Sequence, residues 1–133
     1  MNFIDDLTFN ENKNEIENKT IFISLGNYCI TSNILKDYNL KIESYPFDWM
    51  VSCLDNITHI IENKFELFLD KKNYLTISNL NEKKQTMNLY YFNNTNSLFD
   101  NSILCDHQHH NLLNSDDYNY LERCVNRFNS LNK

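Results

Sequence analysis

Apolar residues follow a strand-like spacing and then a helix-like spacing in the first third of the chain. Residues 20–25 form a short, apolar and β-branched run, which predicts a buried strand that ends at Gly26. From Tyr28 to Tyr38 the apolar residues recur at helical spacing, and Asn27 stands where a helix N-cap is expected. The pattern therefore predicts a strand that passes through Gly26 directly into a helix.

The rest of the chain predicts further helices and strands. An apolar stripe predicts a helix over residues 52–63, and another stripe predicts a helix over 117–129, with Ser115 or Asp116 as its cap. Residues 74–77 and 87–92 read as two strands joined by a polar connection, and Ile103 and Leu104 suggest another after a loop over 93–101. Together these elements predict an α/β (α+β) fold, a small sheet with flanking helices.

The length suits one domain. The chain has 133 residues. Residues 1–19 are polar and charged, so we expect a loosely ordered lead-in, followed by a single domain over residues 20–133. The composition holds one Gly, one Pro, no Ala and 24 Asn. An AT-rich genome produces this bias, so single Asn residues carry little information, whereas Gly26 and Pro46 stand out against it.

Charge and cysteine usage narrow the function classes. The net charge is −6, which argues against nucleic-acid binding because a phosphate surface needs clustered Lys and Arg. No apolar run is long enough to predict a membrane span, and the acidic start does not resemble a signal peptide. We therefore expect a cytoplasmic protein with no membrane partner. The four cysteines form no C-x-x-C pair, so no zinc knuckle or thioredoxin motif is present.

Cys29 is the candidate nucleophile. It follows Gly26 and Asn27 at the expected start of a helix, where unpaired N–H groups stabilise an anion such as a thiolate. The backbone N–H groups near Asn27 and Cys29 could also bind the oxyanion that forms when a thiolate attacks a carbonyl. Gly26 would let a substrate backbone approach closely. The alternative is that Cys29 is a packed, inert thiol.

A histidine cluster lies far downstream, over residues 105–110. One interpretation is that a histidine of this cluster acts as the base for Cys29, with an Asp or Asn orienting its ring. A second is a zinc site at Cys105, His107 and His109, joined by Cys124. A third is an exposed loop that has become rich in histidine by drift.

Three strings resemble a known family. They are S-L-G-N-Y-C at 24–29, S-Y-P-F-D-W at 44–49 and E-R-C-V-N-R-F at 122–128. This succession resembles the motifs of a family described as putative papain-like cysteine peptidases, over about residues 20–130. Members of that family usually continue with further strands and helices beyond the third string, so the resemblance implies a chain shortened at its C-terminus.

The resemblance implies a cysteine hydrolase of the peptidase or amidase type with a Cys–His dyad or triad. Cys29 would be the nucleophile, His109 the first choice as base and His107 the second, and Asp48 would orient the histidine. Gly26, Asn27 and Trp49 would bind the oxyanion and substrate. It implies a papain-like strand–Cys–helix core, a protein or peptide substrate, and no metal or cofactor. The alternative function is a catalytically inactive peptidase-like module that binds a protein.

Overall fold

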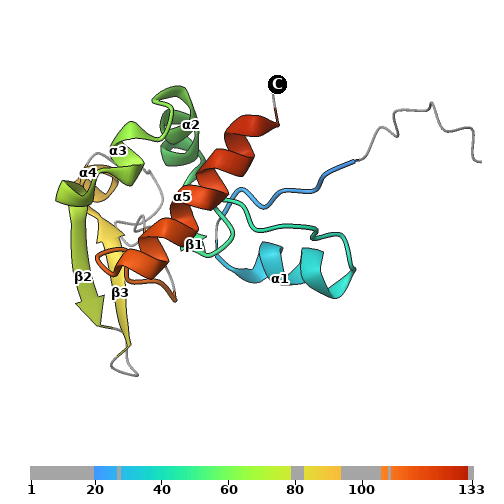
Figure 1. Ribbon diagram of the computed structural model, residues 1–133, viewed down its shortest axis with the longest axis horizontal. Helices are drawn as coiled ribbons and strands as arrows, with labels where there is room; N and C mark the ends of the chain where they lie inside the picture. The colour runs from blue at the N-terminus through green and yellow to red at the C-terminus, as the bar shows by residue number, and fades with distance from the viewer. Residues whose placement is uncertain (1–19, 27, 79–82, 94–105, 108, 132–133) are drawn as a thin grey trace, which may run out of the picture.

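The computed structural model describes residues 20–131, apart from residues 27, 79–82, 94–105 and 108. Helices and a small sheet alternate along the described chain, as the sequence predicts (Figure 1). The elements are α1 Ile30–Asp37, β1 Met50–Val51, α2 Leu54–Glu62, α3 Glu66–Leu69, the 3-10 turn η1 Lys71–Asn73, β2 Tyr74–Ser78, β3 Lys84–Asn88, α4 Leu89–Asn93, β4 Asp106–His107 and α5 Ser115–Ser130. The α+β class is confirmed.

The sheet joins segments that lie far apart in the sequence. Its strand order is β1-β4-β3-β2, and each neighbouring pair is antiparallel. The predicted pairing of β2 with the following strand is confirmed. In the short strand β4, His107 stands opposite Met50 of β1 and opposite Thr86 of β3. The sheet therefore places a residue of the histidine cluster in the interior, next to the strand that follows Trp49.

The core is aromatic and centres on Phe47, which is fully buried. Its ring lies 5.8 Å from that of Phe65, 6.1 Å from that of Phe68 and 6.0 Å from that of Phe128 on α5. Offset and edge-on aromatic pairs at such spacing are favourable. Part of the 44–49 string is thus a packing element that joins α5 to the segment between α2 and α3.

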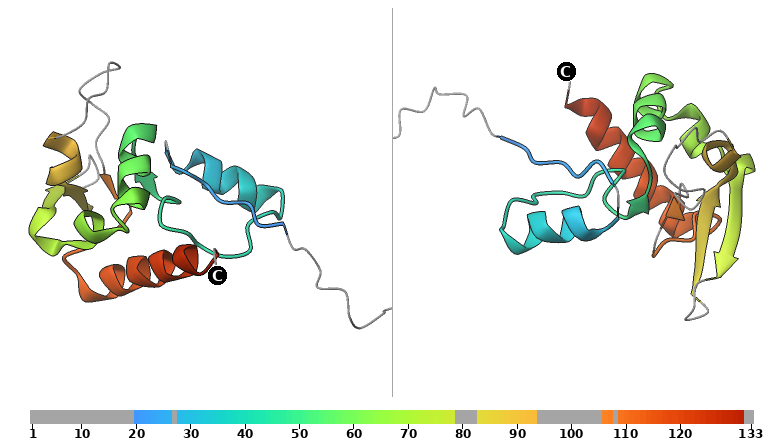
Figure 2. Two further views of the ribbon diagram at one scale, coloured as in Figure 1. Left: turned by 90° about the horizontal axis from the view of Figure 1, so that it is seen from above. Right: turned by 180° about the vertical axis from the view of Figure 1, so that it is seen from behind.

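Two predicted strands differ from the structure. No strand is found over residues 20–26, and Ile21, Phe22 and Leu25 are 40%, 44% and 47% exposed. This prediction is wrong because an apolar run becomes a strand only beside a partner, and the described sheet places none next to it. The papain-like strand–Cys–helix core is therefore not present in the expected form. Figure 2 shows the extended segment running alongside α1, apart from the sheet.

The second difference is at residues 87–92, where the structure has the end of β3 followed by α4. Asn88 explains the change, because its Oδ1 accepts from the N–H groups of Tyr90 at 3.1 Å and Tyr91 at 3.4 Å. This side-chain bonding starts a helix and ends the strand. The strand prediction over residues 87–92 is thus wrong beyond Asn88.

The three predicted helices are confirmed, but they begin and end at other residues than predicted. Helix α5 starts two residues earlier than expected, and its cap is Asn114, whose Oδ1 accepts from the N–H of Asp116 at 2.8 Å. Ser115 and Asp116 are therefore not the cap. The predictions for residues 1–19, for the loop beyond Asn93 and for a strand at residues 103–104 lie outside the described residues.

Candidate active site

Cys29 stands at the N-cap position of α1 and is partly exposed. The two described residues before it have left-handed backbone, with φ of 87° at Gly26 and 79° at Tyr28. Positive φ suits glycine but is strained for tyrosine. Gly26 is buried, and a Cβ there would contact Ile57 and the Phe47 and Met50 carbonyls. Its backbone conformation therefore requires glycine, and its open side faces the protein interior. The prediction that Asn27 is the N-cap is wrong, because the helix begins at Ile30 and the N-cap position is that of Cys29; Asn27 itself lies outside the described residues.

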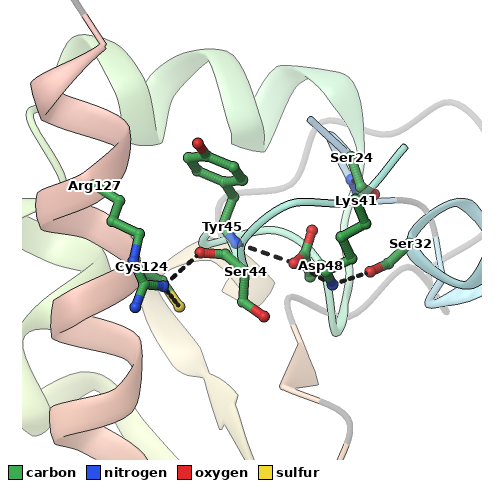
Figure 3. A network of polar contacts seen from close by, with 9 residues as sticks. Ser24, Ser32, Lys41, Ser44, Tyr45, Asp48, Cys124 and Arg127 are labelled. Atoms are coloured by element: carbon green, nitrogen blue, oxygen red, sulfur yellow. Dashed lines mark hydrogen bonds and ion pairs between the residues drawn. The ribbon is translucent and has the colours of Figure 1, made fainter. Parts of the chain in front are cut away.

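Asp48 is buried and forms an ion pair with Lys41, whose Nζ lies 2.6 Å from Asp48 Oδ2. The same Nζ donates to Ser32 Oγ on α1 at 2.5 Å, and Asp48 Oδ2 accepts from the Tyr45 N–H at 3.0 Å (Figure 3). Asp48 forms no hydrogen bond with a histidine within the described part of the chain. Its carboxylate instead joins the helix that carries Cys29 to the turn that carries Trp49.

Trp49 links this network to the histidine cluster. Lys41 Nζ lies 4.9 Å from the centre of the Trp49 ring, a cation–π distance. The ring of His109 meets the same indole edge-on, with 6.1 Å between the ring centres. His109 is exposed and has a positive φ of 69°. A single aromatic side chain therefore contacts both the Lys41 network and His109.

His107 lies in the interior and is 3% exposed. Its ring lies 5.1 Å from that of Phe68 and 6.1 Å from that of Tyr74. Burial, together with the positive charge that His110 can carry, lowers the pKa of His107 from 6.5 to about 3. Its Nε2 is buried and has no hydrogen-bond partner among the residues that the structure describes. His107 is therefore a neutral imidazole at physiological pH.

This buried imidazole makes stability depend on pH. The pKa of His107 is lower in the folded protein than in the unfolded chain, so its neutral form stabilises the fold fully above about pH 6.5 and less as the pH falls toward 3. We expect this residue to lower the free energy of unfolding by about 2 kcal/mol when the pH falls from 7 to 5. Urea unfolding of the wild type and of His107→Phe at both pH values measures it. An equal loss in the variant would contradict the assignment.

His110 and Asp117 form a His–carboxylate pair that the sequence pattern does not predict. His110 Nδ1 lies 3.5 Å from Asp117 Oδ1, and Asp117 Oδ2 accepts from the Asn111 N–H at 2.8 Å. The His110 ring stacks on Tyr120 with 5.0 Å between the ring centres. An acidic residue in the first turn of the helix that follows a histidine cluster is the signal that could have revealed this pair.

Arg127 links helix α5 to the 44–48 turn by a hydrogen bond. Its Nη1 donates to the Ser44 carbonyl at 2.9 Å and reaches Cys124 Sγ at 3.8 Å (Figure 3). Cys124 is fully buried, and burial raises the pKa of its thiol. Cys124 therefore belongs to the core. A buried thiol of this kind is unsuited to nucleophilic attack.

The structure brings some predicted site residues together and leaves others apart. Lys41 and Trp49 connect the Cys29 helix with His109, but Cys29 Sγ makes no hydrogen bond with an imidazole among the described residues. No group of three His, Cys, Asp or Glu side chains in the described ranges could hold a metal ion, and Cys105 lies outside them. In that same part of the chain, no helix is long and apolar enough to cross a membrane.

One comparison with known proteins identifies a family. A family model described as "putative papain-like cysteine peptidase" matches residues 20–133. An uncharacterized protein of Acanthamoeba polyphaga mimivirus is 50% identical over 56 residues, which are 40% of this chain and 24% of that protein. The matched segment thus spans about a quarter of that relative. No solved structure matches the chain.

Proposed function

Because this chain belongs to the family of putative papain-like cysteine peptidases, we propose that it is a cysteine hydrolase that cleaves a peptide or amide bond. Cys29 is the nucleophile and His109 is the base. His109 takes the proton of the Cys29 thiol, and the sulfur attacks the carbonyl carbon. The C–N bond breaks as the amine leaves with that proton, and water, deprotonated by His109, then cleaves the thioester to release the carboxylic acid and restore the thiol. The backbone N–H groups around Asn27 and Cys29 bind the oxyanion.

The contacts of Trp49 carry this proposal. Lys41 bonds to Ser32, one turn beyond Cys29, and lies over the indole that His109 touches from the edge. His109 is thus the histidine whose contacts lead back to the Cys29 helix. His107 is committed to the core. Asp48 acts as a positioning residue, because it holds Lys41 and the turn before Trp49 in place.

Backbone strain supports the assignment of Cys29 as nucleophile and His109 as base. Five described non-glycine residues have positive φ. Asn39, Lys64 and Phe65 follow the ends of α1 and α2, where left-handed backbone is ordinary. Tyr28 and His109 follow no helix end, and one adjoins the proposed nucleophile while the other is the proposed base. Strained residues gather at catalytic sites, where the surrounding structure holds them.

The alternative is a catalytically inactive peptidase-like module that binds a protein. Two observations favour the binding module. Cys29 makes no hydrogen bond with a described histidine, and the Asp48 carboxylate forms its ion pair with Lys41. Catalytic hydrogen bonds are often long in a free enzyme and shorten when substrate binds. The reactivity of Cys29 therefore distinguishes the two functions.

Alkylation by iodoacetamide at pH 6 tests the proposal. Cys53 is a matched control, because it is also partly exposed and stands at the N-cap of α2. We expect Cys29 to react at least about tenfold faster than Cys53, since a paired thiolate is the reactive form. Mass spectrometry of peptides from timed samples gives both rates. Equal rates would show that a helix end alone sets the reactivity and would favour the binding module.

A further inference from the structure

Helix α1 exposes its apolar stripe and buries a polar residue. Ile30, Ile34 and Tyr38 follow one another at intervals of four residues, so they lie along one side of the helix and its C-terminal end. Their side chains are 61%, 49% and 74% exposed, whereas Ser32 is fully buried and bonds to Lys41. An amphipathic helix normally turns its apolar side toward the protein interior. The stripe of α1 instead faces away from the body of the described chain.

The extended segment over residues 20–25 lies alongside α1 and offers an open backbone edge (Figure 2). None of its N–H or C=O groups forms a backbone hydrogen bond within the part of the chain that the structure describes. Unpaired extended backbone is a template for another strand. Together with the stripe of α1, this segment makes the apolar surface of residues 20–42, which we call the α1 face.

The apolar area of the α1 face reaches the size of a protein interface. Among the described residues of 20–42, nine large apolar side chains are between 39% and 74% exposed. Such a side chain carries about 150–250 Å² when fully exposed, so together they present on the order of 800 Å² to solvent. The largest apolar patch of a monomer is usually about 300–600 Å², and a stable dimer buries about 800 Å² on each partner.

We infer that the α1 face is the surface through which two copies of this chain form a twofold dimer. An extended edge pairs antiparallel with its own copy across a twofold axis, because each strand then supplies both donors and acceptors. The same assembly covers the apolar side chains of each copy with those of the other. One partner thus satisfies both the open backbone edge and the exposed stripe.

The charges of the α1 face suit a second copy. In a twofold interface a patch meets its own copy, so a patch of a single sign would repel itself. The exposed charged residues of 20–42 are Lys36 and Asp37, which cancel, while Lys41 is already paired with Asp48. A lipid surface suits this face less well, because it supplies no backbone hydrogen bonds to residues 20–25 and favours clustered basic residues.

The mass of the full chain in solution tests the inference. We expect analytical ultracentrifugation to give twice the chain mass of 16.0 kDa at about 100 µM and a falling average mass toward about 1 µM. A protein that stays monomeric at the higher concentration would overturn the inference, and its α1 face would then belong to a different partner. A mass that rises beyond two copies would overturn it too, because open-ended edge pairing is not a twofold interface.

Two matched variants assign the dimer to the α1 face. Ile30 and Leu54 are each the first residue of a helix, α1 and α2, and they are 61% and 69% exposed. Ile30→Lys should raise the dissociation constant of the dimer roughly tenfold or more, whereas Leu54→Lys should leave it unchanged. Equal effects would place the interface elsewhere and overturn the inference. If Ile30→Lys does not fold, Tyr38→Lys replaces it, because Tyr38 is 74% exposed at the other end of the stripe.

Hydrogen exchange tests the pairing of the extended segment. The amides of residues 20–25 should exchange at least about tenfold more slowly in the dimer than in the dilute monomer, since each paired strand protects the other. Equal exchange at both concentrations would contradict strand pairing.

The inference goes beyond the proposed hydrolysis and does not depend on it, because none of these measurements involves catalysis. A dimer whose Cys29 is unreactive would support the α1 face and remove the hydrolase. A monomer whose Cys29 is reactive would remove the dimer and leave the hydrolase in place.

Discussion

Replacing Cys29 by alanine is expected to lower peptide hydrolysis by roughly three orders of magnitude or more, because the attacking sulfur is lost while binding remains. The rate is measured with a fluorogenic peptide mixture under single-turnover conditions. Cys53→Ala is the matched control. Cys53 is also partly exposed before a helix, and this variant should keep the wild-type rate.

The base is tested by the same assay. His109→Gln should lose roughly a hundredfold in rate, the usual contribution of a positioned base. His59→Gln should lose little, since the ring of His59 contacts Tyr90 and Tyr91 and not Trp49. Retained hydrolysis in Cys29→Ala would contradict the nucleophile assignment. An unchanged rate in His109→Gln would move the role of base to another histidine, with His110 first because Asp117 already contacts it.

Replacing Lys41 by methionine is expected to lower the free energy of unfolding by about 3–5 kcal/mol. The side chains of Lys41 and Asp48 are only 12% and 2% exposed, so the variant leaves the Asp48 carboxylate buried without its counter-charge. The Ser32 contact that ties α1 to this turn is lost as well. Urea unfolding followed by circular dichroism measures the change.

The double variant identifies the cause. Asp48→Asn keeps an oxygen for the Tyr45 N–H but removes the negative charge. We expect Lys41→Met combined with Asp48→Asn to be more stable than Lys41→Met alone, because no unpaired charge then remains in the interior. If the two losses simply add, the ion pair contributes nothing beyond packing. The pair would then not explain how the Cys29 helix is held.

Helices α1, α2 and α5 and the pairing of β2 with β3 could be predicted from the sequence because their signals are local. Apolar stripes at helical spacing run through α2 and α5, and each stripe needs only a core to pack against. The side-chain bonding of Asn88 is also local, yet the aromatic run that follows it has strong β-propensity and hides the helix. Short apolar runs do not by themselves separate strands from helices.

The candidate site was predictable only in part. Cys29 stands out by its position after the single glycine, and Asp48 and Trp49 by the string around the single proline. Their partners do not stand out, because Lys41 is an ordinary lysine in the sequence and becomes a buried counter-charge only when the turn folds over α1. The His110–Asp117 pair likewise depends on how α5 begins.

The sequence by itself determined the α+β class, the helices α1, α2 and α5 and the family, since propensity, periodicity and motif strings are properties of neighbouring residues. Only the tertiary structure decided that residues 20–26 form no strand, that His107 is a neutral residue of the core, and that Asp48 pairs with Lys41. The reason is physical: a strand needs a neighbouring strand, burial sets the pKa of an imidazole, and a charge pair needs two side chains brought together by the fold.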